Sequence, residues 1–301
     1  MHSKQAYHVT SATQRSAIRH SSRHRLRAHL ERAGLYTLLA LTVLVMSAPL
    51  VWMLLSSLKP DRENAAYPPT ILPHTWTLEN YQLLFTISDF GMYLRNSCIV
   101  ASISTLLTVV IGVNAAYALS RFHFHWLNIL AGIALFAYTI PPILVLVPIA
   151  RIVTGLGLGN SLTSLIILYT ATLLPFALWV LRSYFNGLEI EIEHAAMIDG
   201  CTRFGAFVRV ALPQAVPGII STSIFTFNAA WSEYLFASTL TVSPDKLTLS
   251  PGLSLLLDQT GVYSWGLLMA SAVVITVPVL ILFTIIQRRL VHGLGDGAVT
   301  G

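Results

Sequence analysis

The chain has 301 residues, of which 54% are hydrophobic and only 10% are charged, and its net charge is +5 at neutral pH. A soluble domain carries about 25% charged residues, so this composition excludes an ordinary soluble enzyme and indicates a polytopic membrane protein. Two cysteines, Cys98 and Cys201, are too few for a disulfide framework or a metal cluster. We therefore predict an all-α membrane protein without a metal site. We expect no nucleic-acid partner, because the basic residues stand where membrane topology would place them.

The chain begins with a polar, basic segment, residues 1–33, in which seven lysines and arginines face a single acid, Glu31. We expect a cytoplasmic arm whose charge orients the first helix, or which lies on anionic lipid headgroups. The apolar run 35–55 that follows is too long for a signal-peptide core and lacks a small-x-small cleavage site. It is therefore predicted to be a retained first span.

Six apolar segments are long enough to cross the ~30 Å hydrocarbon core of a bilayer, which takes about 20 helical residues. They lie at roughly 35–56, 92–118, 127–150, 162–182, 217–241 and 265–286. Proline interrupts several of them, which is tolerable where neighbouring helices or cavity water satisfy the freed carbonyl groups. We expect a kinked bundle around a cavity rather than six straight rods.

The distribution of basic residues predicts the orientation. With the N-terminus inside, the inside segments hold thirteen of the eighteen lysines and arginines and the outside segments hold five. The positive-inside rule then favours N-in and C-in. The chain divides into the arm 1–33, a six-span domain 34–287 and a cytoplasmic tail 288–301, and the polar stretch 188–213 faces the cytoplasm.

The outside segments carry two predictions. Residues 57–91 are rich in proline and aromatic residues, so we expect them to be ordered against the outer rim of the bundle. Residues 151–161, "RIVTGLGLGNS", are glycine-rich but lack the lysine and the strand-to-helix context of a phosphate-binding loop, which favours a tight turn. Nothing else resembles a nucleotide site. If ATP drives this protein, the ATPase is therefore another chain.

The polar stretch 188–213 separates two apolar spans. Its alternating apolar and acidic residues predict a short helix over 188–199, whose early acids complement the helix dipole. Gly200 frees the backbone for a reversal. Thr202 is a candidate N-cap for a second short helix, which Pro213 is expected to end. Two short helices joined by a glycine turn would form a compact knob on the membrane surface.

One spacing pattern runs through this stretch, on His194, Ala195, Ala196, Gly200, Val210, Leu212 and Pro213. It resembles the EAA loop of binding-protein-dependent ABC importer permeases: E-A-A, three residues, G, nine residues, I, one residue, L-P. Histidine replaces the glutamate, and valine the isoleucine. In that family the loop forms coupling helices that sit in a cleft of the ATPase subunit, where the glutamate makes a polar contact.

The resemblance implies an ATPase-coupling site in this chain. Either Glu193 substitutes for the family's glutamate or His194 hydrogen-bonds in its place. The candidate coupling residues are Glu193, His194, Ala195, Ala196, Asp199, Gly200, Phe204, Leu212 and Pro213.

The resemblance extends over about residues 35–301 and points to the carbohydrate branch, specifically to the subunit similar to the smaller maltose-type permease. The segments that carry it are "TLENYQLLF" (77–85), "YLRNSCIVA" (93–101), "AYALSRFHF" (116–124), "IPPILVLVPI" (140–149), "LPFALWVLRSYF" (174–185) and "AAWSEYLFA" (229–237). The chain ends in "QRRLVHGLGDGAVTG", which resembles the basic tail of that branch, with Thr300 where lysine is usual.

What the resemblance implies is a type I ABC importer permease in a bacterial cytoplasmic membrane. A second permease subunit, two ATPase subunits that use ATP and Mg, an external solute-binding protein and membrane lipid would be its partners. This chain would hold no cofactor and would not be an enzyme. It would move a di- or oligosaccharide by alternating access, with the knob passing on the closure of the ATPases. An ion-coupled secondary transporter, or an ABC permease for glycerol 3-phosphate, is the alternative.

Polar groups at membrane depth are costly and mark functional sites by default. The fifth predicted span offers Asn228, Trp231, Ser232, Glu233 and Tyr234, and an aromatic face beside an amide or carboxylate suits a sugar. The alternative is that these residues bond other helices or anchor at an interface.

Asn96 and Asn114 in the second span are expected to form interhelical hydrogen bonds. His123 and His125 lie too near the membrane face to suggest a metal.

Overall fold

The computed structural model describes residues 32–86, 88–122, 125–260 and 264–295, except for the side chains of 257–260 and 286–295. Within these ranges the chain is helical and contains no β-strand, as predicted. Most of the predicted N-terminal arm, His123, and the last six residues with Thr300 lie outside the described residues.

Four helices are long and apolar enough to cross a membrane. They are Arg32–Ser57, α4 (Phe90–Arg121), α7 (Leu162–Asn186) and α14 (Trp265–Gly295), the last of these apolar over Trp265–Ile285. They coincide with the first, second, fourth and sixth predicted spans. Pro175 in α7 and Pro278 in α14 do not end their helices.

The third predicted span is broken rather than kinked. α5 (His125–Tyr138) and α6 (Pro142–Gly155) meet at 108°. Pro141 and Pro142 stand together at this break, and neither has an amide hydrogen with which to continue the helical ladder.

The fifth predicted span, 217–241, is also interrupted. α11 (Val216–Trp231) stops at Ser232, and a separate short helix, α12 (Leu235–Leu240), follows. α11 reaches the length of a span only together with the segment Arg203–Gln214, which meets it at 69°. By length and composition the described residues thus hold four spans, or up to six if each bent pair counts as one.

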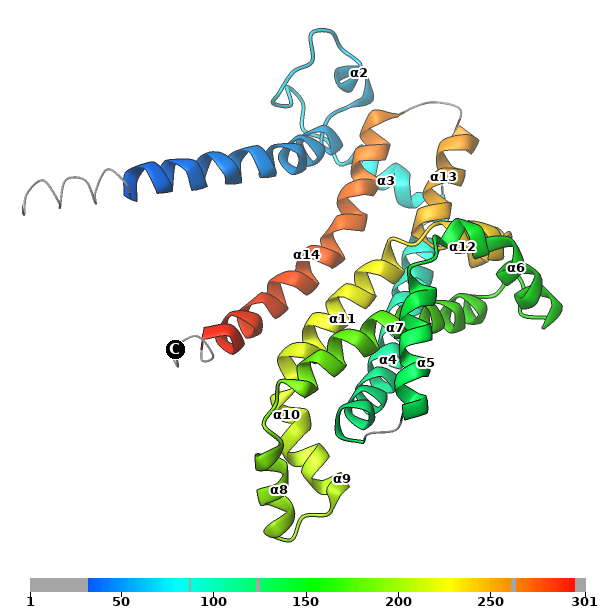
Figure 1. Ribbon diagram of the computed structural model, residues 1–301. Helices are drawn as coiled ribbons and strands as arrows, with labels where there is room; N and C mark the ends of the chain where they lie inside the picture. The colour runs from blue at the N-terminus through cyan, green and yellow to red at the C-terminus, as the bar shows by residue number, and fades with distance from the viewer. Residues whose placement is uncertain (1–31, 87, 123–124, 261–263, 296–301) are drawn as a thin grey trace, which may run out of the picture.

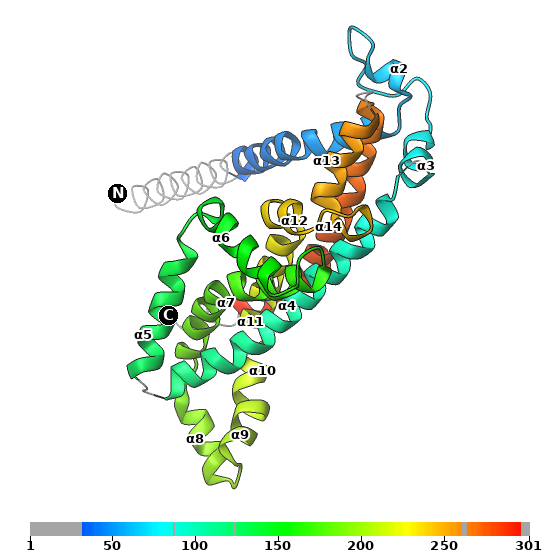
Figure 2. The same cartoon turned by 90° about the vertical axis from the view of Figure 1, so that its right-hand side faces the viewer.

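Helix α4 is the central element of the bundle. It packs along α7 and α11, as Figures 1 and 2 show from two sides. Gly112 allows the close approach to α7, because a Cβ at this position would lie 3.2 Å from Leu181 Cδ1 and 3.6 Å from Ala177 Cβ. Small residues at such contacts let helix backbones approach, and van der Waals packing then holds the helices together in lipid.

The first helix, Arg32–Ser57, stands away from this bundle (Figure 1). None of its most apolar window is buried inside the chain. Its apolar surface is therefore open along its length in the isolated subunit.

The segment 57–91, predicted to lie outside and named the outer segment from here on, packs through its two short helices against α14. It holds α2 (Asp61–Asn64) and α3 (Glu79–Thr86). Lys59 is buried: its ammonium donates to the Thr70 carbonyl and lies 5.1 Å from the centre of the Trp52 ring. Asn80 Nδ2 donates to the carbonyls of Ser57 and Lys59, which ties α3 to the start of this segment.

Residues 156–161 form the predicted turn, while α6 takes up the start of the segment expected to turn. Gly157 (φ 72°) and Asn160 (φ 53°) adopt the left-handed backbone conformation that permits it. Asn160 also fixes the chain that follows α12. Its Oδ1 accepts from the backbone amides of Val242 and Ser243, and its backbone amide donates to the Leu240 carbonyl. The short helix η2 (Pro244–Lys246) and α13 (Leu249–Thr260) come next.

Candidate functional site

Residues 188–214, named the knob from here on, project from one end of the bundle (Figures 1 and 2). The knob consists of α8 (Ile190–Ile198), α9 (Arg203–Ala206), a π-helical turn (Phe207–Ala211) and α10 (Leu212–Gln214). Two predicted features are confirmed. Gly200 makes the reversal at φ 95°, and Thr202 Oγ1 caps the second helix by accepting from the Gly205 amide at 3.1 Å.

The expectation that Pro213 ends the second helix is wrong. The helical path runs through Pro213 to Gln214, and the bend comes at Ala215. A proline lacks the amide that the carbonyl four residues earlier would accept. Here a wider π-helical turn lies immediately before α10, and it lets the chain stay helical without that hydrogen bond.

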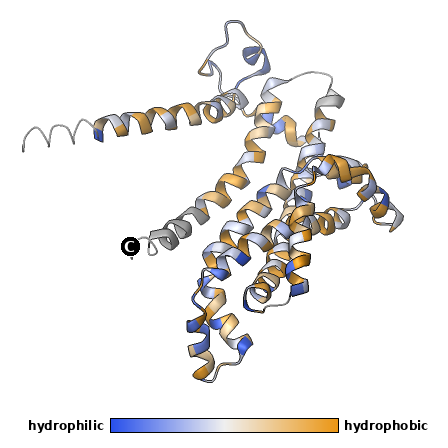
Figure 3. Cartoon of the chain, viewed as in Figure 1, coloured by the Kyte–Doolittle hydropathy of each residue, from blue (hydrophilic) through white to orange (hydrophobic). Residues whose placement is uncertain are grey.

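The tip of the knob is exposed and partly apolar. Ile198 is 86% exposed and Phe204 is 71% exposed, although both are large apolar side chains. His194, Ala195 and Asp199 are exposed beside them. Figure 3 shows the same mixture: the knob alternates hydrophilic and hydrophobic residues, whereas the long helices are mostly hydrophobic. Ala196 and Leu212 are half-buried, while Gly200 and Pro213 are exposed.

Glu193 does not belong to this exposed surface, which corrects its assignment as a substitute contact for an ATPase. Only 4% of the residue is exposed, and its carboxylate points into the bundle. Glu193 Oε1 pairs with Arg121 Nη2 at 2.7 Å and Nε at 2.9 Å. Its Oε2 accepts from the Tyr117 hydroxyl at 2.8 Å. His194 lies on the exposed side of α8.

The base of the knob rests on residues that sequence reasoning did not select. Arg121, the last residue of α4, also donates to the carbonyls of Phe185 and Leu188 at 3.0 and 3.4 Å. The Tyr117 ring packs against Phe207 and Phe185, with centroids 4.3 and 5.6 Å apart. The only sequence signal for this cluster is a basic residue at the end of an apolar span, and that signal also marks ordinary topology.

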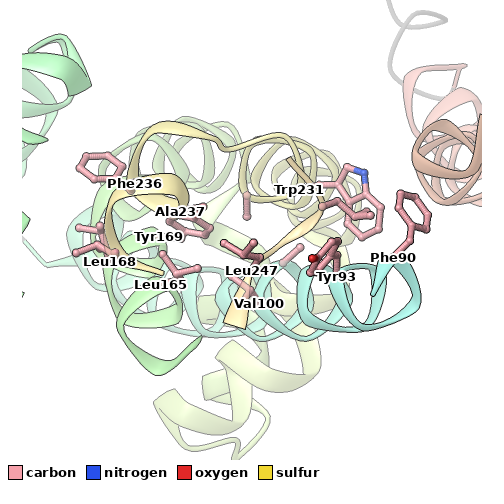
Figure 4. Packing of buried hydrophobic residues seen from close by; sticks show 14 of the residues in the cluster. Phe90, Tyr93, Val100, Leu165, Leu168, Tyr169, Trp231, Phe236, Ala237 and Leu247 are labelled. Atoms are coloured by element: carbon pink, nitrogen blue, oxygen red, sulfur yellow. The ribbon is translucent and has the colours of Figure 1, made fainter. Parts of the chain in front are cut away.

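The predicted substrate path divides into two groups. Trp231 is 4% exposed and lies in the buried cluster that also holds Phe90 and Tyr93 of α4 (Figure 4). Its Nε1 donates to the Ile275 carbonyl at 3.2 Å, and its ring stacks on Phe227. Trp231 therefore offers no open aromatic face to a sugar, which corrects that expectation in favour of the structural alternative.

Glu233 is half-buried, and its carboxylate is hydrogen-bonded within the chain. Its two carboxylate oxygens accept from the backbone amides of Phe236 and Ala237 at 2.9 and 3.0 Å. The Tyr169 hydroxyl donates to it at 2.5 Å. Glu233 thus accepts hydrogen bonds from two amides in the first turn of α12, and amides in the first turn of a helix have no partner within the helix itself.

Asn228, Ser232 and Tyr234 remain exposed in the subunit. Ser232 Oγ donates to the Asn228 carbonyl at 2.8 Å, so these two residues share one face at the end of α11. Among the weaker candidates, Asn96 Nδ2 donates to the carbonyls of Asp245 in η2 and of Leu247 just after it, so its partners lie in the segment between α12 and α13 rather than in another long helix. Asn114 instead bonds Val110 in its own helix, which contradicts the interhelical prediction.

No cluster of three metal-ligating side chains occurs within the described part of the chain.

Comparison with known proteins decides the family. Residues 108–295 match the family described as "Binding-protein-dependent transport system inner membrane component". This chain belongs to that family. The permease is 38% identical over 274 residues to the inner membrane ABC transporter permease protein YcjP of Escherichia coli, covering 90% of this chain and 98% of that protein. The predicted resemblance is confirmed, and the chain is a multi-pass membrane subunit of an ABC transporter.

Other relatives of this permease are named for sugars or sugar derivatives. It is 39% identical over 253 residues to the sulfoquinovosyl glycerol transport system permease protein SmoH of Agrobacterium fabrum, covering 84% and 88% of the two chains. It is 34% identical over 265 residues to the trehalose/maltose transport system permease protein MalG of Thermococcus litoralis, covering 87% and 94%.

Among solved structures, the permease shares its fold with a bacterial ABC transporter involved in the import of the acidic polysaccharide alginate. The TM-score is 0.71 at 18% identity, over 84% of this chain and 94% of the other. A second structure of a bacterial alginate ABC transporter, in complex with a pentasaccharide-bound periplasmic protein, has a TM-score of 0.60 at 13% identity, over 87% and 94%.

Proposed function

We propose that this permease imports a di- or oligosaccharide that an external binding protein delivers, driven by separate ATPase subunits that bind the knob. The observation that carries the proposal is the knob itself, with an exposed apolar tip on a firmly anchored base. The sugars named in SmoH and MalG support the substrate class. A secondary transporter would need an acid at membrane depth that is free to bind the coupling ion, and the Glu233 carboxylate, the candidate in the fifth predicted span, is occupied by two amides and a hydroxyl.

The chemistry of the tip suits a protein partner. Large apolar side chains that stay exposed beside polar residues are typical of interaction sites. Ile198 and Phe204 flank the Gly200 reversal, so both exposed apolar side chains lie at the tip of the knob. A partner that pushes on this tip would move the base with it, because the aromatic contacts of Tyr117 and the ion pair of Glu193 tie the base to the bundle.

The remaining partners follow from the same proposal. A second permease subunit, and lipid, would cover the open apolar surface of the helix Arg32–Ser57. The two ATPase subunits would supply the ATP and Mg chemistry, and this chain itself would hold no cofactor. We place the complex in a bacterial cytoplasmic membrane with six spans and with both chain ends inside, on the thirteen-to-five excess of basic residues.

For the sugar path through this subunit, the proposal is now restricted to Asn228, Ser232 and Tyr234. Their side chains are exposed at and just after the end of α11, while Trp231 is buried and the Glu233 carboxylate is hydrogen-bonded to Tyr169. An amide, a hydroxyl and a phenol supply the hydrogen bonds that a sugar requires.

The experiment is ATP hydrolysis by the reconstituted complex with and without sugar-loaded binding protein. We expect Gly200→Pro, which cannot adopt φ 95°, and Ala196→Trp, which enlarges the knob, to abolish sugar-stimulated hydrolysis while the subunit still inserts. Tyr67→Ala, at a residue 96% exposed on the outer segment, is the matched control and is expected to keep stimulation. Normal stimulation in both knob variants would remove the docking proposal.

A further inference from the structure

Helix α4 is anchored by buried side chains at both of its ends, in two different parts of the molecule. At the knob end, Arg121 binds the Glu193 carboxylate of α8 and the carbonyls of Phe185 and Leu188. The side chains of Arg121 and Glu193 are only 7% and 5% exposed. One guanidinium thus joins the end of α4, the end of α7 and the first helix of the knob.

At the other end, two neighbouring residues of α4 hold the segment 241–249, named the outer loop. Asn96 Nδ2 donates to the carbonyls of Asp245 and Leu247 at 3.0 and 2.9 Å. Ser97 Oγ accepts from the Leu249 amide at 2.8 Å. Asn96 is 2% exposed and Ser97 is 4% exposed, so water cannot readily replace these bonds.

The helix between the two anchors is continuous. Arg121 lies 25 residues after Asn96, about 37 Å along the axis at 1.5 Å per residue. No proline interrupts α4, and proline is the commonest cause of a sharp kink. Close packing at Gly112, against Leu181 and Ala177 of α7, braces its middle.

We propose that α4 is a rigid rod that carries movement of the knob to the outer loop, and that Arg121 and Asn96 are the positioning residues at its two ends. The inference rests on the proposed docking of ATPases at the knob. It adds a physical connection across the membrane, with one named anchor at each end. Breaking a buried anchor costs more than moving the two anchored parts together, so the knob and the outer loop shift as one unit.

The test uses the full reconstituted complex with Cys98→Ser and Cys201→Ser, and spin labels on Asp245 in the outer loop and Ile71 in the outer segment. The Asp245 side chain is 55% exposed and Ile71 is 69% exposed. The label separation is measured with and without ATP and Mg. We expect ATP to change it in the unmodified background.

Two variants cut the rod at opposite ends. Asn96→Leu removes two of the three outer hydrogen bonds, and the double variant Arg121→Met/Glu193→Leu removes the inner ion pair without leaving a buried charge. We expect the ATP-dependent change to be lost in both, and the amount of sugar transported per ATP to fall several-fold. Asn114→Leu removes an amide of the same helix that bonds only Val110, and it should behave as the background does.

Retention of the full ATP-dependent change in both anchor variants would overturn the rod. A label separation that ATP does not change in the Cys98→Ser/Cys201→Ser background would also overturn the rod. If that same sample still shows sugar-stimulated ATP hydrolysis, the proposed function stands. Should Asn96→Leu fail to assemble, Ser97→Ala deletes only one outer hydrogen bond and should reduce the change.

Discussion

The buried ion pair between Arg121 and Glu193 gives the sharpest prediction for stability. Arg121→Met alone leaves the Glu193 carboxylate buried with a single hydrogen bond, from the Tyr117 hydroxyl. Removing one partner of a buried pair costs about 3–5 kcal/mol, because the other charge stays desolvated. Glu193→Leu leaves the Arg121 guanidinium with the carbonyls of Phe185 and Leu188, so its cost should be smaller, about 1.5–3 kcal/mol.

The double variant Arg121→Met/Glu193→Leu should recover much of this loss, since replacing a whole buried pair by apolar residues is often close to neutral. Reversible unfolding of the detergent-solubilised subunit, or the temperature at which half of it leaves the folded gel-filtration peak, measures the three variants. A double variant as unstable as the sum of the two single variants would show that the charges do not interact, and would refute the anchored base.

Three further predictions concern other parts of the chain. Gly200→Ala should destabilise the knob by about 1–2 kcal/mol, because φ is 95° and a Cβ is strained in that conformation. No atom lies within 4 Å of the added Cβ, so backbone strain is the only cost. Proteolysis within the knob should become faster, and unchanged proteolysis would contradict the prediction. Glu233→Gln and Tyr169→Phe should lower stability by about 0.5–2 kcal/mol with little change in sugar affinity, as loss of a helix cap does; a large affinity loss at unchanged stability would restore Glu233 as a sugar contact. The hydrogen bond from the His74 amide holds the pKa of the Glu63 carboxyl below its ordinary value. The ionised carboxylate therefore stabilises the outer segment at neutral pH, and this stabilisation is lost as the pH falls through the lowered pKa. Protease resistance of the segment should drop on acidification in the native protein and depend less on pH in Glu63→Gln.

The long helices could be predicted from the sequence because hydrophobic length alone identifies a span. The effect of proline could not. Pro175 and Pro278 lie inside continuous helices, whereas Pro141 and Pro142 accompany a 108° break. The same residue type gives both results because packing around the freed carbonyl decides whether the helix continues.

The knob shows a similar division. Gly200 and Thr202 were predictable, since their roles depend on local backbone geometry and one side-chain bond three residues away. Which face of α8 turns inward was not predictable. It depends on Arg121, 72 residues earlier in the chain, whose guanidinium draws Glu193 into the bundle and leaves His194 outside. The spacing of residues within the knob therefore could not identify Arg121 as the partner of Glu193.

The central claim is that the exposed tip of the knob binds ATPase subunits on the cytoplasmic side, and site-directed cross-linking tests it most directly. In the Cys98→Ser/Cys201→Ser background, a cysteine introduced at Ile198, 86% exposed at the tip, is compared with one at Tyr67, 96% exposed on the outer segment. In membranes that contain the whole complex, the Ile198→Cys variant should cross-link to an ATPase subunit and resist an impermeant thiol reagent added from outside. The Tyr67→Cys variant should show the reverse. A tip that reacts from outside and yields no ATPase adduct would contradict both the topology and the docking role.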